Sequence, residues 1–309
     1  MMKLKNFKGE IILTITALIW GTAFVAQSMG MKYTKPFTFN GVRTVVGGIA
    51  LLPVILFMSK SKGESPKTEI NDNKLWIRAG IECGLALLIA SSLQQVGMQY
   101  TTAGKAGFLT ALYIIIVPIL GLFLKKKVRM TVWLSVAIAT IGTYFLSVKQ
   151  GFNIGIGDIY IILCAFGFSV QIMIVDKYAS LTNAVKLSCT QFFVCGISSV
   201  IIALIFEKPQ FSQIMQAAAP ILYAGVMSSG VAYTLQIIGQ RYTEPAIASL
   251  IMSMESVYAA LGGWLILNEQ LTGKELFGCA LVFTAIIITQ IPKKGSSSRS
   301  FEKIETQQA

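Results

Sequence analysis

Two of the charged residues inside apolar stretches of this 309-residue chain, Glu255 and Arg43, could act on a small molecule. Glu255 lies near the centre of the run 246–267, with hydroxyl groups nearby on Ser253, Ser256 and Tyr258. Its carboxyl could bind a proton or a cationic group, or it could be a structural carboxyl bonded to a neighbouring helix. A charge near the middle of a membrane helix costs about 3 kcal/mol on insertion scales, so such a residue needs a partner or a role.

Arg43 is the second charged candidate and lies about one turn and a half inside the run 37–58. Its planar guanidinium could hold a carboxylate through two parallel hydrogen bonds. Its shallow position also allows the side chain to reach out to the extracellular interface. Together, Arg43 and Glu255 favour a zwitterionic ligand such as an amino acid.

Amides and aromatic rings in other apolar runs complete the set of candidates. Buried amides either face a ligand or join helices by hydrogen bonds, each worth under about 2 kcal/mol. Aromatic side chains either line a cavity or anchor a helix at the membrane interface. The candidate substrate-binding residues are Glu255, Arg43, Trp20, Gln27, Gln95, Tyr113, Gln171, Gln191 and Tyr258.

Several kinds of chemistry are excluded or disfavoured by residues that the sequence lacks. The absence of histidine removes Ser–His–Asp catalysis and H-E-x-x-H zinc chemistry. The absence of a Walker A pattern makes direct ATP hydrolysis unexpected. All five cysteines fall in apolar stretches without a C-x-x-C pair, which is typical of small packing residues. We expect no cofactor, no metal and no enzymatic activity; scattered carboxylates leave a lipid-modifying enzyme as a weaker alternative.

The elements that hold these residues are expected to be membrane helices. The chain is 54% hydrophobic and 13% charged, whereas soluble domains carry about a quarter charged residues. Its apolar runs are each close to the roughly 20 residues that a membrane helix needs. The first run is longer than a typical signal-peptide core, so we expect it to be retained as a span. We predict an all-α membrane protein with ten transmembrane helices, at 10–29, 37–58, 77–98, 104–124, 130–147, 157–175, 185–206, 217–238, 246–267 and 274–291.

The basic residues predict the orientation of these helices. Nineteen Lys and Arg residues fall on one side of the expected bilayer and six on the other. The positive-inside rule therefore places both termini in the cytoplasm, which an even number of spans requires. Because the net charge of +12 comes from these short connections, it does not indicate nucleic-acid binding. The polar segment 292–309 is expected to be a disordered cytoplasmic tail.

The chain also repeats itself. An offset of 148 residues sets Gly9-Glu10 against Gly157-Asp158, Trp20 against Phe168, and Arg43 against Gln191. Later in the chain the offset is 142, which sets Tyr113 against Glu255. Two five-helix units, 9–147 and 157–291, would cross the membrane in opposite directions because five is odd. Such inverted repeats are a recurring plan of secondary transporters.

The first repeat begins with Gly9-Glu10 and continues to Leu18-Ile19-Trp20-Gly21-Thr22, with Arg43 in the next run. This segment resembles the opening of the EamA domain of the drug/metabolite transporter superfamily. The segment 100–113, YTTAGKAGFLTALY, is also similar to that domain. In the second half, Glu244-Pro245-Ala246 and then Leu267-Asn268-Glu269 resemble the family's closing pattern. The resemblance covers residues 9–291. It implies ten spans, two EamA repeats, a central cavity and, in many members, export of amino acids or other metabolites.

These observations predict a secondary transporter of the cell membrane that works by alternating access, with export expected from the resemblance. An Arg43–Glu255 pair that opens and closes during transport is a further hypothesis. The expected partners are a small-molecule substrate and the lipid bilayer, without nucleic acid, and a monomer is compatible with this plan. A membrane channel remains the alternative, although no filter sequence is visible.

Overall fold

The computed structural model describes residues 7–60, 73–101, 103–147, 155–267 and 272–289. The expected disordered tail, 292–309, lies outside the described residues. The described part of the chain is helical and contains no strand. Its helices are α1 (Lys8–Gly30), α2 (Pro36–Lys60), α3 (Asn73–Gly97), α4 (Ala103–Thr110), α5 (Tyr113–Phe123), α6 (Met130–Ser147), α7 (Ile156–Tyr178), α8 (Ala184–Phe206), α9 (Phe211–Gln216), α10 (Ala218–Leu222), the π-helix η2 (Tyr223–Tyr233), α11 (Thr234–Gln240), α12 (Pro245–Met252), α13 (Glu255–Leu267) and α14 (Gly273–Thr289).

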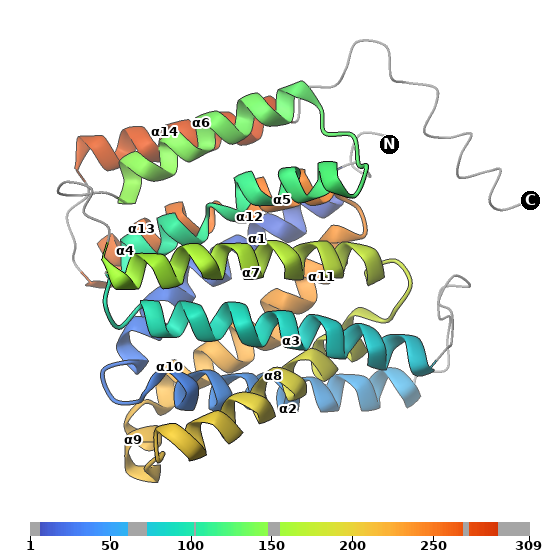
Figure 1. Cartoon of the computed structure of the whole chain (residues 1–309), viewed down its shortest axis with the longest axis vertical. Coiled ribbons are helices and arrows are strands. Elements are labelled where there is room, and N and C mark those ends of the chain that lie inside the picture. The colour runs from blue at the N-terminus through green and yellow to red at the C-terminus, as the bar shows by residue number, and fades with distance from the viewer. Residues whose placement is uncertain (1–6, 61–72, 102, 148–154, 268–271, 290–309) are drawn as a thin grey trace, which may run out of the picture.

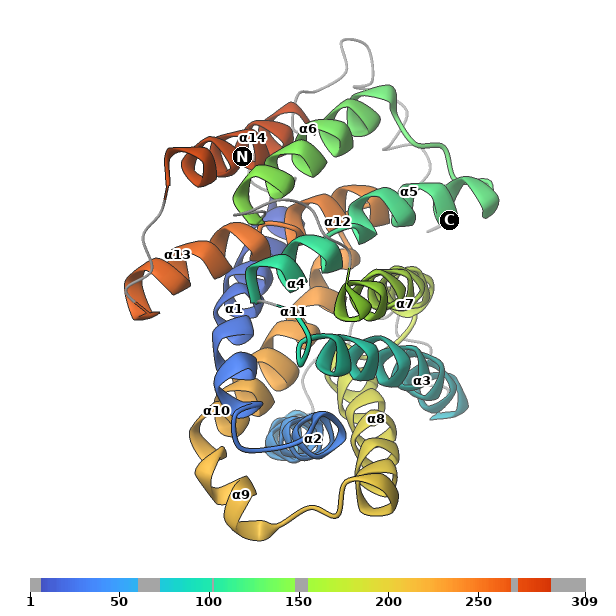
Figure 2. The same cartoon turned by 60° about the vertical axis from the view of Figure 1, so that its left-hand side comes forward.

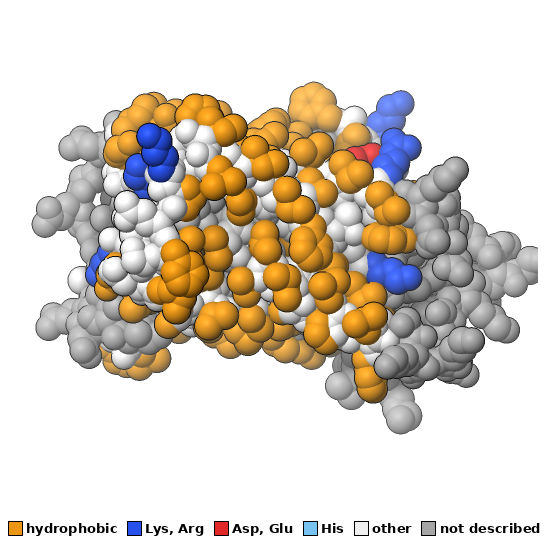
Figure 3. All heavy atoms as spheres, turned by 90° about the horizontal axis from the view of Figure 1, so that it is seen from below, with side chains coloured by type: hydrophobic (Ala, Val, Ile, Leu, Met, Phe, Trp, Pro, Cys, Tyr) orange, Lys and Arg blue, Asp and Glu red, His pale blue; other side chains and the backbone are white. Residues whose placement is uncertain are grey.

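Eight helical stretches of the described residues are long and apolar enough to cross a membrane. A ninth apolar helix, Met130–Leu146, is shorter. Large apolar side chains such as Phe57 and Phe123 are exposed on the outside of the bundle. Figure 3 shows that these side chains cover the middle of the visible face, with Lys and Arg towards its two ends. An apolar belt between charged ends is what a bilayer requires, so the chain is a multi-pass membrane protein.

The helices run roughly side by side and form two groups joined by a central layer (Figures 1 and 2). In one group α2 packs along α8, and α3 packs against both α7 and α8. In the other group α6 packs along α14. Between them, α1 contacts α13, α11 and η2, and α5 contacts α7 and α12. The central layer is therefore built from helices that come from both ends of the sequence.

Two of the spans expected from the sequence are broken near their centres. The run 104–124 is divided into α4 and α5, and the run 246–267 into α12 and α13. At the first break, the N–H of Leu112 donates to the carbonyl oxygen of Leu109 at 3.3 Å. At the second, the N–H of Met254 donates to the carbonyl oxygen of Ile251 at 3.1 Å. These i→i−3 bonds tighten the chain locally, as short 3₁₀ turns do inside longer helices.

The α6–α14 contact depends on two small residues that bring the backbones together. A Cβ atom added to Gly278 would lie 2.6 Å from the carbonyl oxygen of Gly142 and 2.7 Å from the backbone nitrogen of Leu146. A backbone atom cannot move aside as the end of a flexible side chain can. Small residues at membrane helix interfaces allow this kind of close approach.

We expect Gly278→Ala to destabilise the protein because its methyl group would push α14 away from α6. Overpacking of this kind costs about 1–3 kcal/mol. The measurement is the midpoint of thermal unfolding of the purified protein in detergent. Gly273→Ala is the matched control, since a Cβ atom there meets nothing within 4 Å. Equal midpoints for the two variants would contradict a packing role for Gly278.

Candidate functional site

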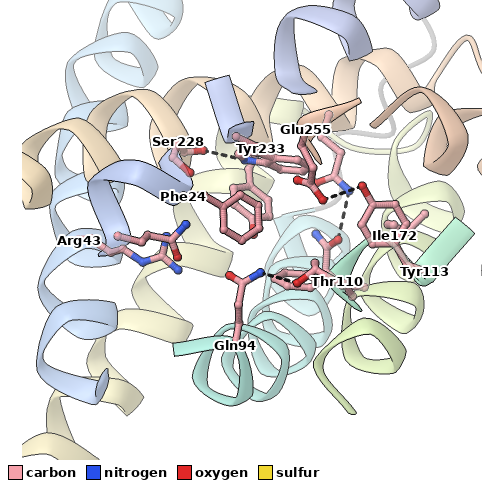
Figure 4. Close-up of a pocket in the computed structure, with 14 residues that line it drawn as sticks. Phe24, Arg43, Gln94, Thr110, Tyr113, Ile172, Ser228, Tyr233 and Glu255 are labelled. Atoms are coloured by element: carbon pink, nitrogen blue, oxygen red, sulfur yellow. Dashed lines mark hydrogen bonds between the residues drawn. The ribbon is translucent and has the colours of Figure 1, made fainter. Parts of the chain in front are cut away.

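A small pocket, the central pocket, lies where helices from both halves of the chain meet. Its volume is about 40 Å³, which is room for only a few water molecules. Figure 4 shows its lining side chains, which include both acidic and basic groups as well as amides and aromatic rings. The lining residues are Trp20, Phe24, Gln27, Arg43, Gln94, Thr110, Tyr113, Phe168, Gln171, Ile172, Ser228, Tyr233, Gln236 and Glu255.

The two helix breaks place a carboxyl and a phenol opposite each other in this pocket. Tyr113 is the first residue of α5, and Glu255 is the first residue of α13. The hydroxyl of Tyr113 donates to Glu255 Oε1 at 2.9 Å. Glu255 is only 4% exposed, and no lysine or arginine among the described residues forms an ion pair with it. Its carboxyl is thus held by one neutral partner and can still accept a proton or a cationic group.

Arg43 reaches the other side of the pocket from α2 and is held by an amide rather than by a carboxylate. Its Nε and one terminal nitrogen donate to Asn40 Oδ1 at 3.2 and 3.0 Å. The Asn40 amide nitrogen donates in turn to Ser91 Oγ at 2.9 Å and Ser199 Oγ at 3.1 Å. This chain ties α2 to α3 and α8 and fixes the guanidinium, which is 4% exposed.

A buried cation without a counter-charge is expensive in a low-dielectric interior. Within the described part of the chain, Arg43 forms no ion pair, and neither does Glu255. In Figure 4, Arg43 and Glu255 lie on opposite sides of the pocket, with the ring of Phe24 drawn between them. The structure therefore shows no direct contact of the kind that the Arg43–Glu255 hypothesis requires. Each group is left to interact with whatever occupies the pocket.

Amide side chains provide further polar groups along the walls. Gln236 Nε2 donates to Gln171 Oε1 at 3.1 Å, and Gln95 Nε2 donates to Gln27 Oε1. The second polar atoms of Gln236 and Gln171 are buried without a hydrogen-bond partner. Buried polar groups are normally paired. The Gln236 oxygen is therefore available to accept a hydrogen bond from a ligand, and the Gln171 nitrogen is available to donate one.

Aromatic side chains close the remaining sides. Trp20 Nε1 donates to the carbonyl oxygen of Ser228 at 3.4 Å, and its ring centroid lies 4.7 Å from that of Tyr233. Phe24 and Phe168 complete an apolar wall. A pocket that combines aromatic walls with a few convergent polar groups is typical of small-molecule sites.

The structure brings most of the candidate residues from the sequence to this pocket. Glu255, Arg43, Trp20, Gln27, Tyr113 and Gln171 line it. Gln95 lies behind the lining, bonded to Gln27. Two candidates are not among the lining residues: Gln191 is buried on α8, and Tyr258 packs beside Gly21 of α1.

Several lining residues were not among the candidates. The sequence could have identified Phe168 as a candidate, because Phe168 is equivalent to Trp20 in the sequence repeat. Phe24, Thr110 and Ile172 are ordinary residues of membrane helices, and only the three-dimensional packing reveals their place. Thr110 accepts a hydrogen bond from Gln94 at 3.2 Å.

The chain is thus a multi-pass helical membrane protein with an internal pocket lined by charged, amide and aromatic side chains. The model of the EamA-like transporter family matches residues 7–148 and again residues 155–291. The chain therefore belongs to the EamA-like transporter family, and it is a transporter rather than an enzyme.

Individual relatives agree with this family. An uncharacterized transporter of Archaeoglobus fulgidus is 32% identical over 289 residues, which is 93% of this chain and 87% of the relative. The uncharacterized transporter YoaV of Bacillus subtilis is 24% identical and covers 90% of this chain and 94% of its own length. A crystal structure of another protein superposes with a TM-score of 0.76 over 92% of this chain and 97% of that one, at 16% identity. That structure supports the fold alone.

Proposed function

We propose that this protein moves a small zwitterionic metabolite, such as an amino acid, across the cytoplasmic membrane by alternating access, with export as the direction. The observation that carries the proposal is the central pocket, in which Arg43 and Glu255 lie without any ion pair among the described residues. A zwitterion would supply a carboxylate for the guanidinium and an ammonium for the carboxyl. The pocket of about 40 Å³ must widen to admit it.

We further propose ten spans in two inverted repeats, residues 9–147 and 157–291. The breaks at 111–112 and 253–254 support this plan because they are 142 residues apart, as the sequence repeat requires. Tyr113 and Glu255, which are equivalent under that offset, bond to each other. A contact between equivalent positions is expected at a two-fold axis that relates the halves.

Close contacts between α1 and α11 and between α3 and α7 support the same symmetry. A Cβ atom on Gly9 would lie 3.1 Å from the carbonyl oxygen of Gly239, and one on Gly157 would lie 2.8 Å from the carbonyl oxygen of Gly97. Gly239 packs against Leu13, and Gly97 packs against Ile161. Leu13 and Ile161 are equivalent under the offset of 148, so exchanging the halves reproduces the contact.

The proposed orientation places both termini in the cytoplasm, on the side of the more basic connections. One copy of the chain contains both repeats and the whole pocket, so we propose that a monomer is sufficient. The substrate-binding residues would be Glu255, Arg43, Trp20, Gln27, Tyr113 and Gln171, with Gln95 supporting Gln27.

Efflux from liposomes tests this function. Purified protein is reconstituted into liposomes loaded with a mixture of amino acids and other metabolites, and the released solutes are identified by mass spectrometry. We expect saturable release of a zwitterionic solute and no release of inorganic ions. Unselective, non-saturating release that includes ions would favour a channel and contradict the proposal.

A further inference from the structure

Two ion pairs join α7 to the span formed by α4 and α5, one near each end of α7. Near its start, Asp158 Oδ2 accepts a hydrogen bond from Lys105 Nζ at 2.5 Å. Near its end, Asp176 forms an ion pair with Lys126, which follows α5. The rise of an α-helix places the two aspartates about 27 Å apart, close to the thickness of a bilayer core. Figure 1 shows α4 and α5 running alongside α7 between these ends.

The ion pair at the Lys105 end is tightly closed. Besides the lysine, Thr101 Oγ1 donates to Asp158 Oδ1 at 3.0 Å and the N–H of Gly155 donates to Asp158 Oδ2 at 2.7 Å. The side chains of Asp158 and Lys105 are 3% and 20% exposed. A carboxylate with several donors in a partly dry site makes strong, charge-assisted hydrogen bonds. This end of α7 is therefore fixed to α4.

The ion pair at the Lys126 end borders a second, larger cavity. Its volume is about 500 Å³, which lies in the usual range for small-molecule sites. Lys126 and Asp176 are part of its wall. On α7, Ile172 lines the central pocket and Met173 lines this cavity. The two spaces thus lie within about one helical turn of each other, separated by the apolar cluster that contains Val117, Ile172, Met173 and Ile247.

We propose that these two ion pairs are alternating latches that control access to the central pocket from opposite sides of the membrane. Opening Lys105–Asp158 connects the pocket to one side, and opening Lys126–Asp176 connects it to the other through the larger cavity. Both pairs are formed in this structure, in which the central pocket has a volume of only about 40 Å³. The inference rests on the proposed alternating-access function and adds the residues that gate it.

The repeat explains why the second latch uses a different pair. The offsets of 148 and 142 set Asp158 against Glu10, Thr101 against Thr243, and Lys105 against Ile247. The symmetric position therefore has an acid and a hydroxyl but no lysine. Glu10 Oε2 and Thr243 Oγ1 are buried without hydrogen-bond partners. The repeat equivalents of Lys105 and Asp158 therefore cannot form an ion pair at the Lys126 end. Lys126 and Asp176, which are not those equivalents, form one there.

Sided labelling of a pocket residue tests the proposal without any need for a substrate. Ile172→Cys places a thiol in the wall of the central pocket. A membrane-impermeant maleimide is then added to one side of oriented vesicles. Mass spectrometry separates this thiol from the five native cysteines, which are all buried. In this background we expect Asp158→Asn to raise labelling about tenfold from the Lys105 side only, as a population shift would. Asp176→Asn should raise labelling by a similar factor from the Lys126 side only.

Glu82→Gln is the matched control, because Glu82 forms ion pairs with Arg78 and Lys177 but lines neither cavity. It should leave labelling unchanged. The double reversal Lys126→Asp with Asp176→Lys should restore low labelling if the ion pair itself is the latch. Labelling that rises equally from both sides, or not at all in either variant, would overturn the latches. Sided labelling with no efflux of any zwitterion would retain the latches and contradict the proposed substrate.

Discussion

Efflux of the zwitterionic substrate is expected to fall about 100-fold in Glu255→Gln, the order expected when a required charge in a buried site is neutralised. Glutamine has the shape of glutamate and can still accept the hydrogen bond from Tyr113, so the fold should survive. It can neither bind a proton nor form an ion pair with an ammonium group. The measurement is the initial rate of efflux from liposomes at several pH values.

The pH profile separates a titrating carboxyl from a structural one. We expect the wild-type rate to change with pH and the small residual rate of Glu255→Gln to be independent of pH. Tyr113→Phe removes the only side-chain hydrogen bond that Glu255 accepts among the described residues, and should change the pH profile without abolishing transport. Unchanged efflux in Glu255→Gln would show that Glu255 only joins helices, while the transporter family would be unaffected.

The second large effect is expected from Arg43→Gln, which should lower the apparent affinity for a carboxylate substrate at least about 30-fold. Removing one partner of a buried charge pair costs about 2–5 kcal/mol. Glutamine is the residue at the equivalent position of the second repeat, Gln191, so a membrane helix of this fold accepts it there. Arg43→Lys keeps the charge but loses the two-pronged geometry, and should give an intermediate affinity.

A substrate ester provides the sharpest readout for Arg43. Wild-type protein should prefer the free carboxylate over its methyl ester, and Arg43→Gln should lose most of that preference. Arg78→Gln is the control, because Arg78 is exposed and pairs with Glu82 outside both cavities. An unchanged preference in Arg43→Gln would mean that the guanidinium has only a structural role, held by Asn40.

Hydropathy and the sequence repeat predicted the helical membrane class, and the resemblance of the motifs to the EamA domain predicted the family, because these patterns are spread over the whole chain. They also identified Tyr113 and Glu255 as equivalent positions. They did not predict the breaks before these two residues, since Ala111-Leu112 and Ser253-Met254 contain neither proline nor glycine. The breaks arise from local hydrogen bonding that no window of apolar residues reveals.

The location of the pocket depended even more on tertiary packing. Gln191 and Gln171 are both amides in apolar runs, yet Gln171 lines the pocket and Gln191 does not. The rotation of each helix about its own axis decides this difference, and weakly amphipathic membrane helices contain little information about that rotation. The position of the Arg43 side chain also depended on tertiary packing. The sequence allowed it to lie at the membrane interface, but hydrogen bonds to Asn40 hold it in the pocket wall.

The broken spans also bear on how strongly the transport rate should depend on temperature. At Leu112 and Met254 the regular i→i−4 bonds are already replaced by i→i−3 bonds when the protein is at rest. A helix with such a joint can tilt there without rupturing further backbone hydrogen bonds, each of which is costly to lose in lipid. The activation enthalpy for switching sides should therefore be modest for a helical bundle of this size, with the main barrier arising from side chains at the helix ends.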